Sequence, residues 1–94
     1  MIQDNIDPKY KRELVQLFSA AEKRNLMTEF IDYLLSPGEI RDFSTRIQVM
    51  KRLLKRQNHR QVAKNFNIGI GTVTRGARAL KEHRKTIDKL GIKS

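Results

Sequence analysis

The stretch that decides the fold is Asn58–Ala77, which reads NHRQVAKNFNIGIGTVTRGA. Its first part carries an apolar stripe at helical spacing, made of Val62, Ala63 and Phe66. Asn67 then breaks the pattern, because asparagine takes the left-handed turn conformation at less cost than most residues. Val73 marks the inner side of a second helix. This spacing predicts a helix-turn-helix, in which a short helix, a tight turn and a second helix pack together.

The two helices of this stretch are expected to begin at Asn58, a good N-cap, and at Ile68. The second helix would present small and hydroxyl-bearing residues outward, namely Gly69, Ile70, Gly71, Thr72 and Thr74. Such residues allow close approach to a DNA groove, where hydroxyls bond phosphates or bases and apolar carbons meet thymine methyls. The alternative is an ordinary pair of packed helices, since apolar spacing alone is common.

The positive charge of the chain is concentrated in its second half. Residues 1–50 carry seven Lys or Arg against eight Asp or Glu, and residues 51–94 carry thirteen against two. The net charge of +10 is therefore divided into −1 and +11. An excess of this kind around a helix-turn-helix is typical of proteins that bind a polyanion. Basic helices also bind membranes or acidic partners, but the far sides of these helices lack the Phe and Leu of a membrane anchor, so nucleic acid is favoured.

Composition disfavours several other functions. The chain has no cysteine, and so neither a disulfide framework nor a thiolate metal site. No apolar run approaches the roughly 18 residues of a membrane span, and Met1–Lys9 lacks the apolar core of a signal peptide. We therefore expect a soluble, cytoplasmic protein with no membrane partner. His59 and His83 are the only histidines and no carboxylates cluster, so we expect no enzyme, metal site or cofactor.

The chain is expected to form one all-helical domain of about six helices. Its parts are, in order, a flexible arm over residues 1–6, dimerisation helices over 7–56, the helix-turn-helix over 58–80 and a C-terminal helix over 82–91.

Two helix starts are marked by local chemistry. Asp7 is a cap with Pro8 at the first helical position, where the missing N–H costs nothing. Ser36 and Glu39 can form a capping box at the start of the longest helix, which is expected to end near Lys55.

The apolar stripes exceed what one thin layer of helices could cover. The helix over residues 26–35 has few polar positions and is expected to be buried or shared with another subunit. An obligate homodimer would resolve this, and its two helix-turn-helix units would suit the two halves of a near-palindromic DNA site.

Five short motifs carry a resemblance to a known family: LSPGE at 35–39, TRI at 45–47, LL at 53–54, GIGTVTRG at 69–76 and LK at 80–81. Over roughly residues 10–92 the chain resembles the bacterial tryptophan repressor family, and the run from Ile70 to Gly76 is the most specific part.

What this resemblance implies is an interlocked homodimer that binds operator DNA and represses tryptophan biosynthesis genes when L-tryptophan is bound as corepressor. Two arginines sandwich the indole ring in that family, and one also pairs with the carboxylate; the matching positions are Arg46 and Arg75. Gly76 matches the glycine that leaves room for the indole, and Ser36 the hydroxyl that meets the carboxylate. The positions around the ammonium are the carbonyls of Tyr33 and Leu35, and Ala79.

The same resemblance assigns the DNA contacts. They fall on His59 and Arg60 at the start of the first motif helix, and on Ile70, Gly71, Thr72 and Thr74 of the second. Ligand between Arg46 and Arg75 would set the tilt of the second helix, so that both halves of a dimer fit successive major grooves.

Residues 77–79 depart from the family pattern. The family has Ser-Asn-Ser where this chain has Ala77-Arg78-Ala79. Ala79 cannot accept a hydrogen bond from an ammonium, and Arg78 adds a positive charge nearby. The connection before the helix-turn-helix also looks one residue shorter. The alternatives are therefore a protein that responds to another aromatic acid, or a ligand-independent DNA-binding protein.

Overall fold

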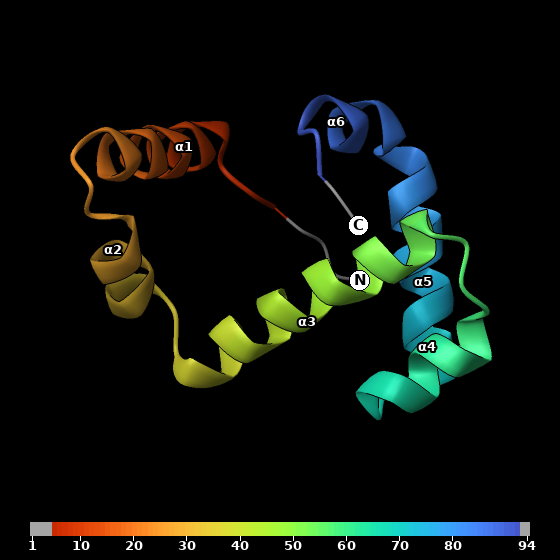
Figure 1. Ribbon diagram of the computed structural model, residues 1–94. Helices are drawn as coiled ribbons and strands as arrows, with labels where there is room; N and C mark the ends of the chain where they lie inside the picture. The colour runs from red at the N-terminus through yellow and green to blue at the C-terminus, as the bar shows by residue number, and fades with distance from the viewer. Residues whose placement is uncertain (1–4, 93–94) are drawn as a thin grey trace. The chain divides into compact units, whose positions relative to one another are not determined.

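Residues 5–92 are described by a computed structural model, and within them every regular element is a helix (Figure 1). In order, these are α1 (Pro8–Lys23), α2 (Met27–Leu34), α3 (Pro37–Leu54), α4 (His59–Phe66), α5 (Ile70–Glu82) and α6 (Arg84–Lys89). This confirms the predicted all-helical class with about six helices. The chain divides into two compact units that meet in the sequence at Ile40 and Arg41, inside α3.

The predicted caps hold the helix starts. The Asp7 carboxylate accepts the Lys9 N–H at 2.8 Å, with Pro8 next to the cap. At the start of α3 the Ser36 N–H donates to Glu39 Oε1 at 2.9 Å, and the Glu39 N–H donates to Ser36 Oγ at 3.2 Å. These reciprocal bonds are the predicted capping box, and they satisfy N–H groups that have no partner within the helix.

Three helices, α1, α3 and α4, are followed by a non-glycine residue whose backbone takes the left-handed helical conformation. Asn25, Arg56 and Asn67 have φ of 58°, 61° and 53°. In each case the next N–H donates back to a carbonyl five residues earlier, at 2.8 to 3.2 Å. These bonds satisfy carbonyls that the helix leaves open and turn the chain sharply.

The N-terminal unit consists of α1, α2 and the first turn of α3. Phe18 and Phe30 pack edge to face, with ring centroids 5.3 Å apart, and Ala21 is buried beside this contact. No side chain of α2 is buried, and Tyr33 is 84% exposed. The expectation that this helix is buried is therefore wrong within one chain, because α1 covers only one side of it; its sharing with another subunit stays a prediction.

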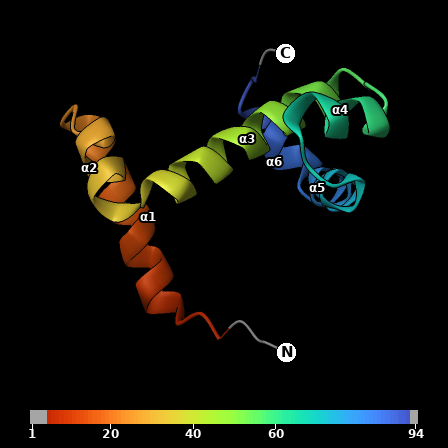
Figure 2. The same ribbon diagram turned by 90° about the horizontal axis from the view of Figure 1, so that it is seen from below.

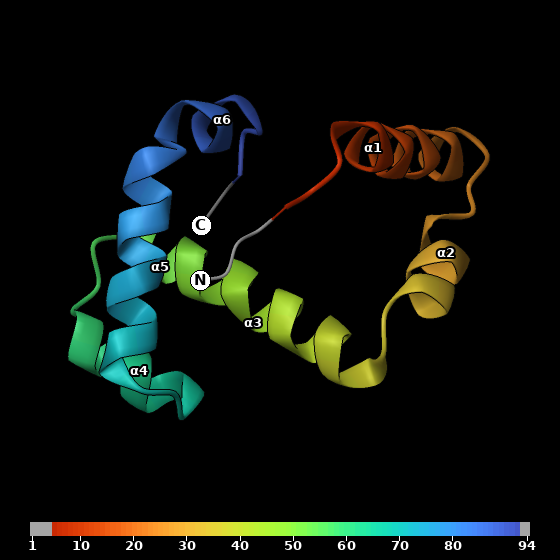
Figure 3. The ribbon, with the colours of Figure 1, turned by 180° about the vertical axis from the view of Figure 1, so that it is seen from behind.

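The C-terminal unit has its core where α3, α4 and α5 meet. Val49, Val62, Ala63 and Val73 are buried there, with Leu53, Phe66 and Ile68 packed around them. Figure 2 shows α5 nearly end-on with α4 crosswise beside it, and Figure 3 shows α6 turning away from the end of α5. Among residues 5–92, no helix combines the length and apolar composition needed to cross a bilayer.

Replacing Asn67 tests the turn between α4 and α5. Asn67→Ala should lower the free energy of unfolding by about 1 kcal/mol, because alanine tolerates the left-handed conformation less well. Asn67→Gly should leave it unchanged or raise it, since glycine has no Cβ to clash. Urea denaturation followed by circular dichroism measures both. Equal stability of the alanine and glycine variants would contradict this role of Asn67.

Candidate functional site

The helices α4 and α5, joined by residues 67–69, have the order and turn predicted for a helix-turn-helix. The Asn58 side chain accepts the Arg60 N–H at 2.8 Å and the Gln61 N–H at 3.3 Å, which confirms the predicted cap. The second helix begins at Ile70, so the predicted start at Ile68 is wrong. Ile68 is drawn into the core, and Gly69 caps α5 in an extended conformation.

One face of α5 is fixed by burial and the opposite face is open. Val73 is fully buried, which directs the residues on the other side of the helix to solvent. Every residue predicted to face outward here is exposed: Gly69, Ile70, Gly71, Thr72 and Thr74. At the start of α4, Arg60 is exposed and His59 is partly buried. The predicted DNA-contacting positions of α5 therefore form an accessible surface at its N-terminal end.

A second feature of α5 is its close approach to α3 at Gly76. A Cβ on Gly76 would lie 3.9 Å from Val49 Cγ1, which is an ordinary van der Waals contact. Arg75 directly precedes this glycine, and Arg46 lies one helical turn before Val49 on α3. The contact thus brings the two chain segments that carry the predicted ligand-binding arginines to the same part of the unit.

Each of the two arginines has a partner on its own helix. The Arg46 guanidinium carbon lies 5.5 Å from the centre of the Phe43 ring. Arg75 Nη2 donates to Thr72 Oγ1 at 3.2 Å. Both arginines are exposed, so their guanidinium groups are accessible to a ligand. The structure shows Arg46 against an aromatic ring, the kind of partner that a planar guanidinium prefers.

The other predicted ligand-binding residues lie at the end of α2, at the start of α3 and on α5. Ser36 Oγ accepts the capping bond from Glu39, which leaves its hydroxyl hydrogen free to donate to a carboxylate. Tyr33 is exposed, and Leu35 follows α2 in an extended conformation. Ala79 is exposed on α5 and has no polar side-chain atom.

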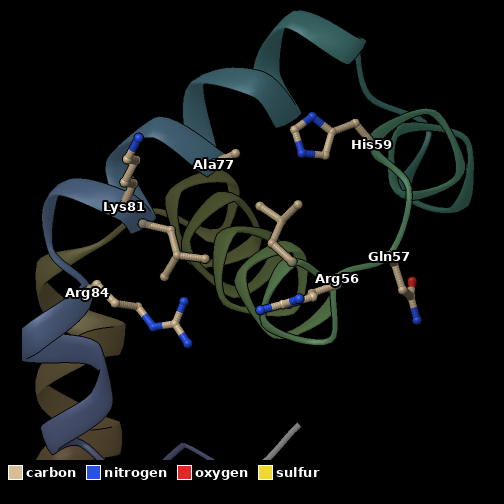
Figure 4. A pocket seen from close by; sticks show the side chains of 8 residues that line it. Arg56, Gln57, His59, Ala77, Lys81 and Arg84 are labelled. Atoms are coloured by element: carbon tan, nitrogen blue, oxygen red, sulfur yellow. The ribbon is translucent and has the colours of Figure 1, made fainter.

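Packing also creates a basic cleft in the C-terminal unit that the sequence analysis missed. Its volume is about 420 Å³, and it lies between the end of α3, the start of α4 and the second half of α5 (Figure 4). The residues that line it are Leu53, Arg56, Gln57, His59, Ala77, Leu80, Lys81 and Arg84.

The lining of this basic cleft combines three exposed cations with two partly buried leucines. No carboxylate lines it, although Arg84 pairs with Asp88 at 2.9 Å along α6. Figure 4 shows Arg56 and Arg84 directed toward each other across the opening. Of the predicted site residues only His59 belongs to it. The sequence shows that positions 56, 81 and 84 carry positive charge. It does not show that they lie together, because only the packing of α3 on α5 brings them to one cleft.

A small all-helical chain, a basic C-terminal half and two short helices joined by a tight turn with an open face are features typical of the class of DNA-binding regulators. A family model described as "Trp repressor protein" matches residues 10–90. The chain belongs to this Trp repressor family, whose members are regulatory proteins, and a role as a repressor follows from that membership.

Individual relatives agree with the family assignment. A "Trp operon repressor homolog" of Vibrio campbellii is 29% identical over 94% of this chain and 90% of its own length. A protein of the same name from Vibrio parahaemolyticus is 27% identical over 80% of this chain and 76% of its own length. Another, from Chlamydia trachomatis serovar L2, is 30% identical over 69% of this chain and 70% of its own length.

Replacing Gly76 tests the contact between α5 and α3. Gly76→Ala should raise the free energy of unfolding by up to about 1 kcal/mol, because alanine favours the helix and its methyl fits against Val49. Gly76→Leu should lower it, because the larger side chain forces α5 away from α3. Thermal and urea denaturation of the two variants give the comparison. A destabilised alanine variant would show that the helices lie closer than described.

Proposed function

We propose that this protein is a homodimeric repressor that binds operator DNA more tightly when L-tryptophan is bound. The observation that carries the proposal is the position of Gly76. It lies against Val49, between the first half of α5, which we propose faces DNA, and the segment of α3 that carries Arg46.

The case for duplex DNA rests on the exposed start of α5 and on charge. Thr72 and Thr74 offer hydroxyls at an open surface, while Gly71 allows the backbone to approach a groove. The net charge of +11 over residues 51–94 would release counterions from a phosphate backbone. The basic cleft adds cations that can take further phosphate contacts.

The case for an aromatic carboxylate as ligand rests on two guanidinium groups and a missing side chain. Arg46 already lies against a phenyl ring, so an indole ring could take the same kind of contact. Arg75 adjoins Gly76, where the absence of a side chain leaves room beside Val49. A guanidinium can also pair with a carboxylate in a planar, two-bond arrangement.

The case for a dimer rests on how little each chain buries. Among residues 5–92 the buried apolar residues are Ala21, Val49, Val62, Ala63 and Val73. Large apolar side chains of α1 to α3 stay exposed, including Leu17, Phe43 and Ile47 at 49%, 44% and 51%. Exposed apolar surface of this extent favours association, and a second copy of the chain offers matching faces.

Ala79 supports a second candidate, in which the ligand is an aromatic acid without an amino group. Its methyl cannot accept a bond from an ammonium, and Arg78 next to it is a cation. A ligand-independent repressor is the remaining possibility. Titrations with tryptophan and with its deaminated analogue, indole-3-propionate, distinguish the three cases.

Arg75→Ala tests the ligand site and the function together. We expect tryptophan to raise the affinity of the wild-type chain for operator duplex, and the variant to lose both tryptophan binding and this response. Arg12→Ala is the matched control, because it removes an exposed guanidinium from α1, outside the proposed site. Calorimetry measures ligand binding, and fluorescence anisotropy of labelled duplex measures the response. Unchanged tryptophan affinity in Arg75→Ala would contradict the site, and no response in the wild-type chain would contradict the corepressor.

Lys81→Gln tests whether the basic cleft contacts the DNA backbone. The logarithm of duplex affinity falls with the logarithm of salt concentration by about 0.9 for each phosphate neutralised. We expect the slope of the variant to be shallower by about that amount, with little change in sequence preference. Lys11→Gln on α1 removes the same charge from the N-terminal unit and serves as control. Equal slopes for Lys81→Gln and the wild-type chain would remove the cleft from the DNA-binding surface.

A further inference from the structure

The Arg75 side chain lies back along α5 toward the start of the helix. Its Nη2 donates to Thr72 Oγ1 at 3.2 Å, and its Nη1 lies 3.5 Å from the place that a Cβ on Gly71 would occupy. Thr72 and Gly71 belong to the proposed DNA-contacting surface, whereas Arg75 belongs to the proposed ligand site. One guanidinium group therefore lies between the two sites.

A guanidinium can serve both sites at once because its faces and its edges do different work. The flat faces stack on aromatic rings, and the N–H groups at the edge donate hydrogen bonds in the plane. The bond to Thr72 uses one edge hydrogen and leaves the faces available to a ring. A ligand can therefore stack on Arg75 while the hydrogen bond to Thr72 is kept. When either the ligand or Thr72 holds the guanidinium in place, the guanidinium is also oriented for the other partner.

The bond from Arg75 also determines what the Thr72 hydroxyl can do. A hydroxyl has one hydrogen to donate and two lone pairs that accept. A helical threonine often donates that hydrogen to a carbonyl of its own helix. When the oxygen accepts from a cation, its O–H is polarised, and it becomes a better donor to a phosphate oxygen or a base acceptor. The exposed Thr72 side chain can present this hydrogen to DNA.

We propose that the Arg75–Thr72 hydrogen bond couples the ligand site to the DNA-contacting surface. This rests on the proposed function, in which a flat ligand stacks on Arg75. Ligand fixes the guanidinium, the guanidinium orients the Thr72 hydroxyl toward DNA, and Thr72 in turn holds the guanidinium in the orientation that stacks. Thr72 is a positioning residue for the ligand, although it does not contact the ligand itself. By reciprocity, duplex DNA that binds Thr72 strengthens ligand binding by the same factor.

Thr72→Val tests this coupling because it removes the hydroxyl and keeps the branched shape. Calorimetry without DNA should show tryptophan binding weakened about threefold, as expected for loss of one exposed hydrogen bond from a charged donor. Thr72→Ser keeps the hydroxyl and should stay close to the wild-type affinity. Thr86→Val makes the same change on α6, outside both proposed sites, and should have no effect. Circular dichroism verifies that each variant is folded.

A second measurement separates coupling from a simple loss of one DNA contact. The ratio of duplex affinities with and without saturating tryptophan should be smaller in Thr72→Val than in the wild-type chain. A lost contact that does not involve Arg75 would weaken both affinities equally and leave the ratio unchanged.

The outcomes have distinct meanings. Wild-type tryptophan affinity in Thr72→Val, or an unchanged ratio, refutes the coupling and leaves the proposed function standing. If the wild-type chain does not bind tryptophan, the corepressor proposal fails and the coupling falls with it.

Discussion

The burial of Val62 of α4 and Val73 of α5 in one core cluster is the constraint on which the rest of the structure depends. Both side chains are fully buried, and they are the largest side chains in residues 5–92 for which this is true. Thr72 and Thr74, on either side of the buried Val73, are both exposed. Gly76, one turn further on, meets α3 at Val49. The surface proposed for DNA and the side proposed for ligand therefore follow from one pair of valines.

The short helix α5 would allow a small protein to combine the two proposed functions, DNA binding and ligand binding. Its 13 residues carry the open threonines at one end and the Arg75–Gly76 pair near the middle. Coupling between two sites usually needs a chain of packed groups with two arrangements. Here the proposed connection between the ligand site and the DNA-contacting surface is one hydrogen bond, between Arg75 and Thr72, which are three residues apart in sequence. As a member of the Trp repressor family, the chain places its proposed regulatory contact inside the helix that would read DNA.

Local chemistry made much of this fold predictable, whereas features that depend on long-range packing were not. Asn58, Asn67 and the Ser36–Glu39 pair act within a few residues of their own position. The structure confirms the two predicted caps and the left-handed conformation of Asn67. The apolar character of Ile68 predicts that it begins α5. In the structure Ile68 precedes the helix and packs against the core instead. The basic cleft is lined by residues of four helices, α3 to α6, with Arg56 and Arg84 among them, and no spacing in the sequence predicts that these residues lie together.

The claim that a flat ligand enters beside Gly76, against α3, can be tested directly by an isotope-filtered nuclear Overhauser experiment on the methyl-labelled protein with tryptophan. We expect cross-peaks between the indole protons and the methyl groups of Val49. Cross-peaks to Leu53 and Leu80 without any to Val49 would place the ligand in the basic cleft and would contradict its entry beside Gly76.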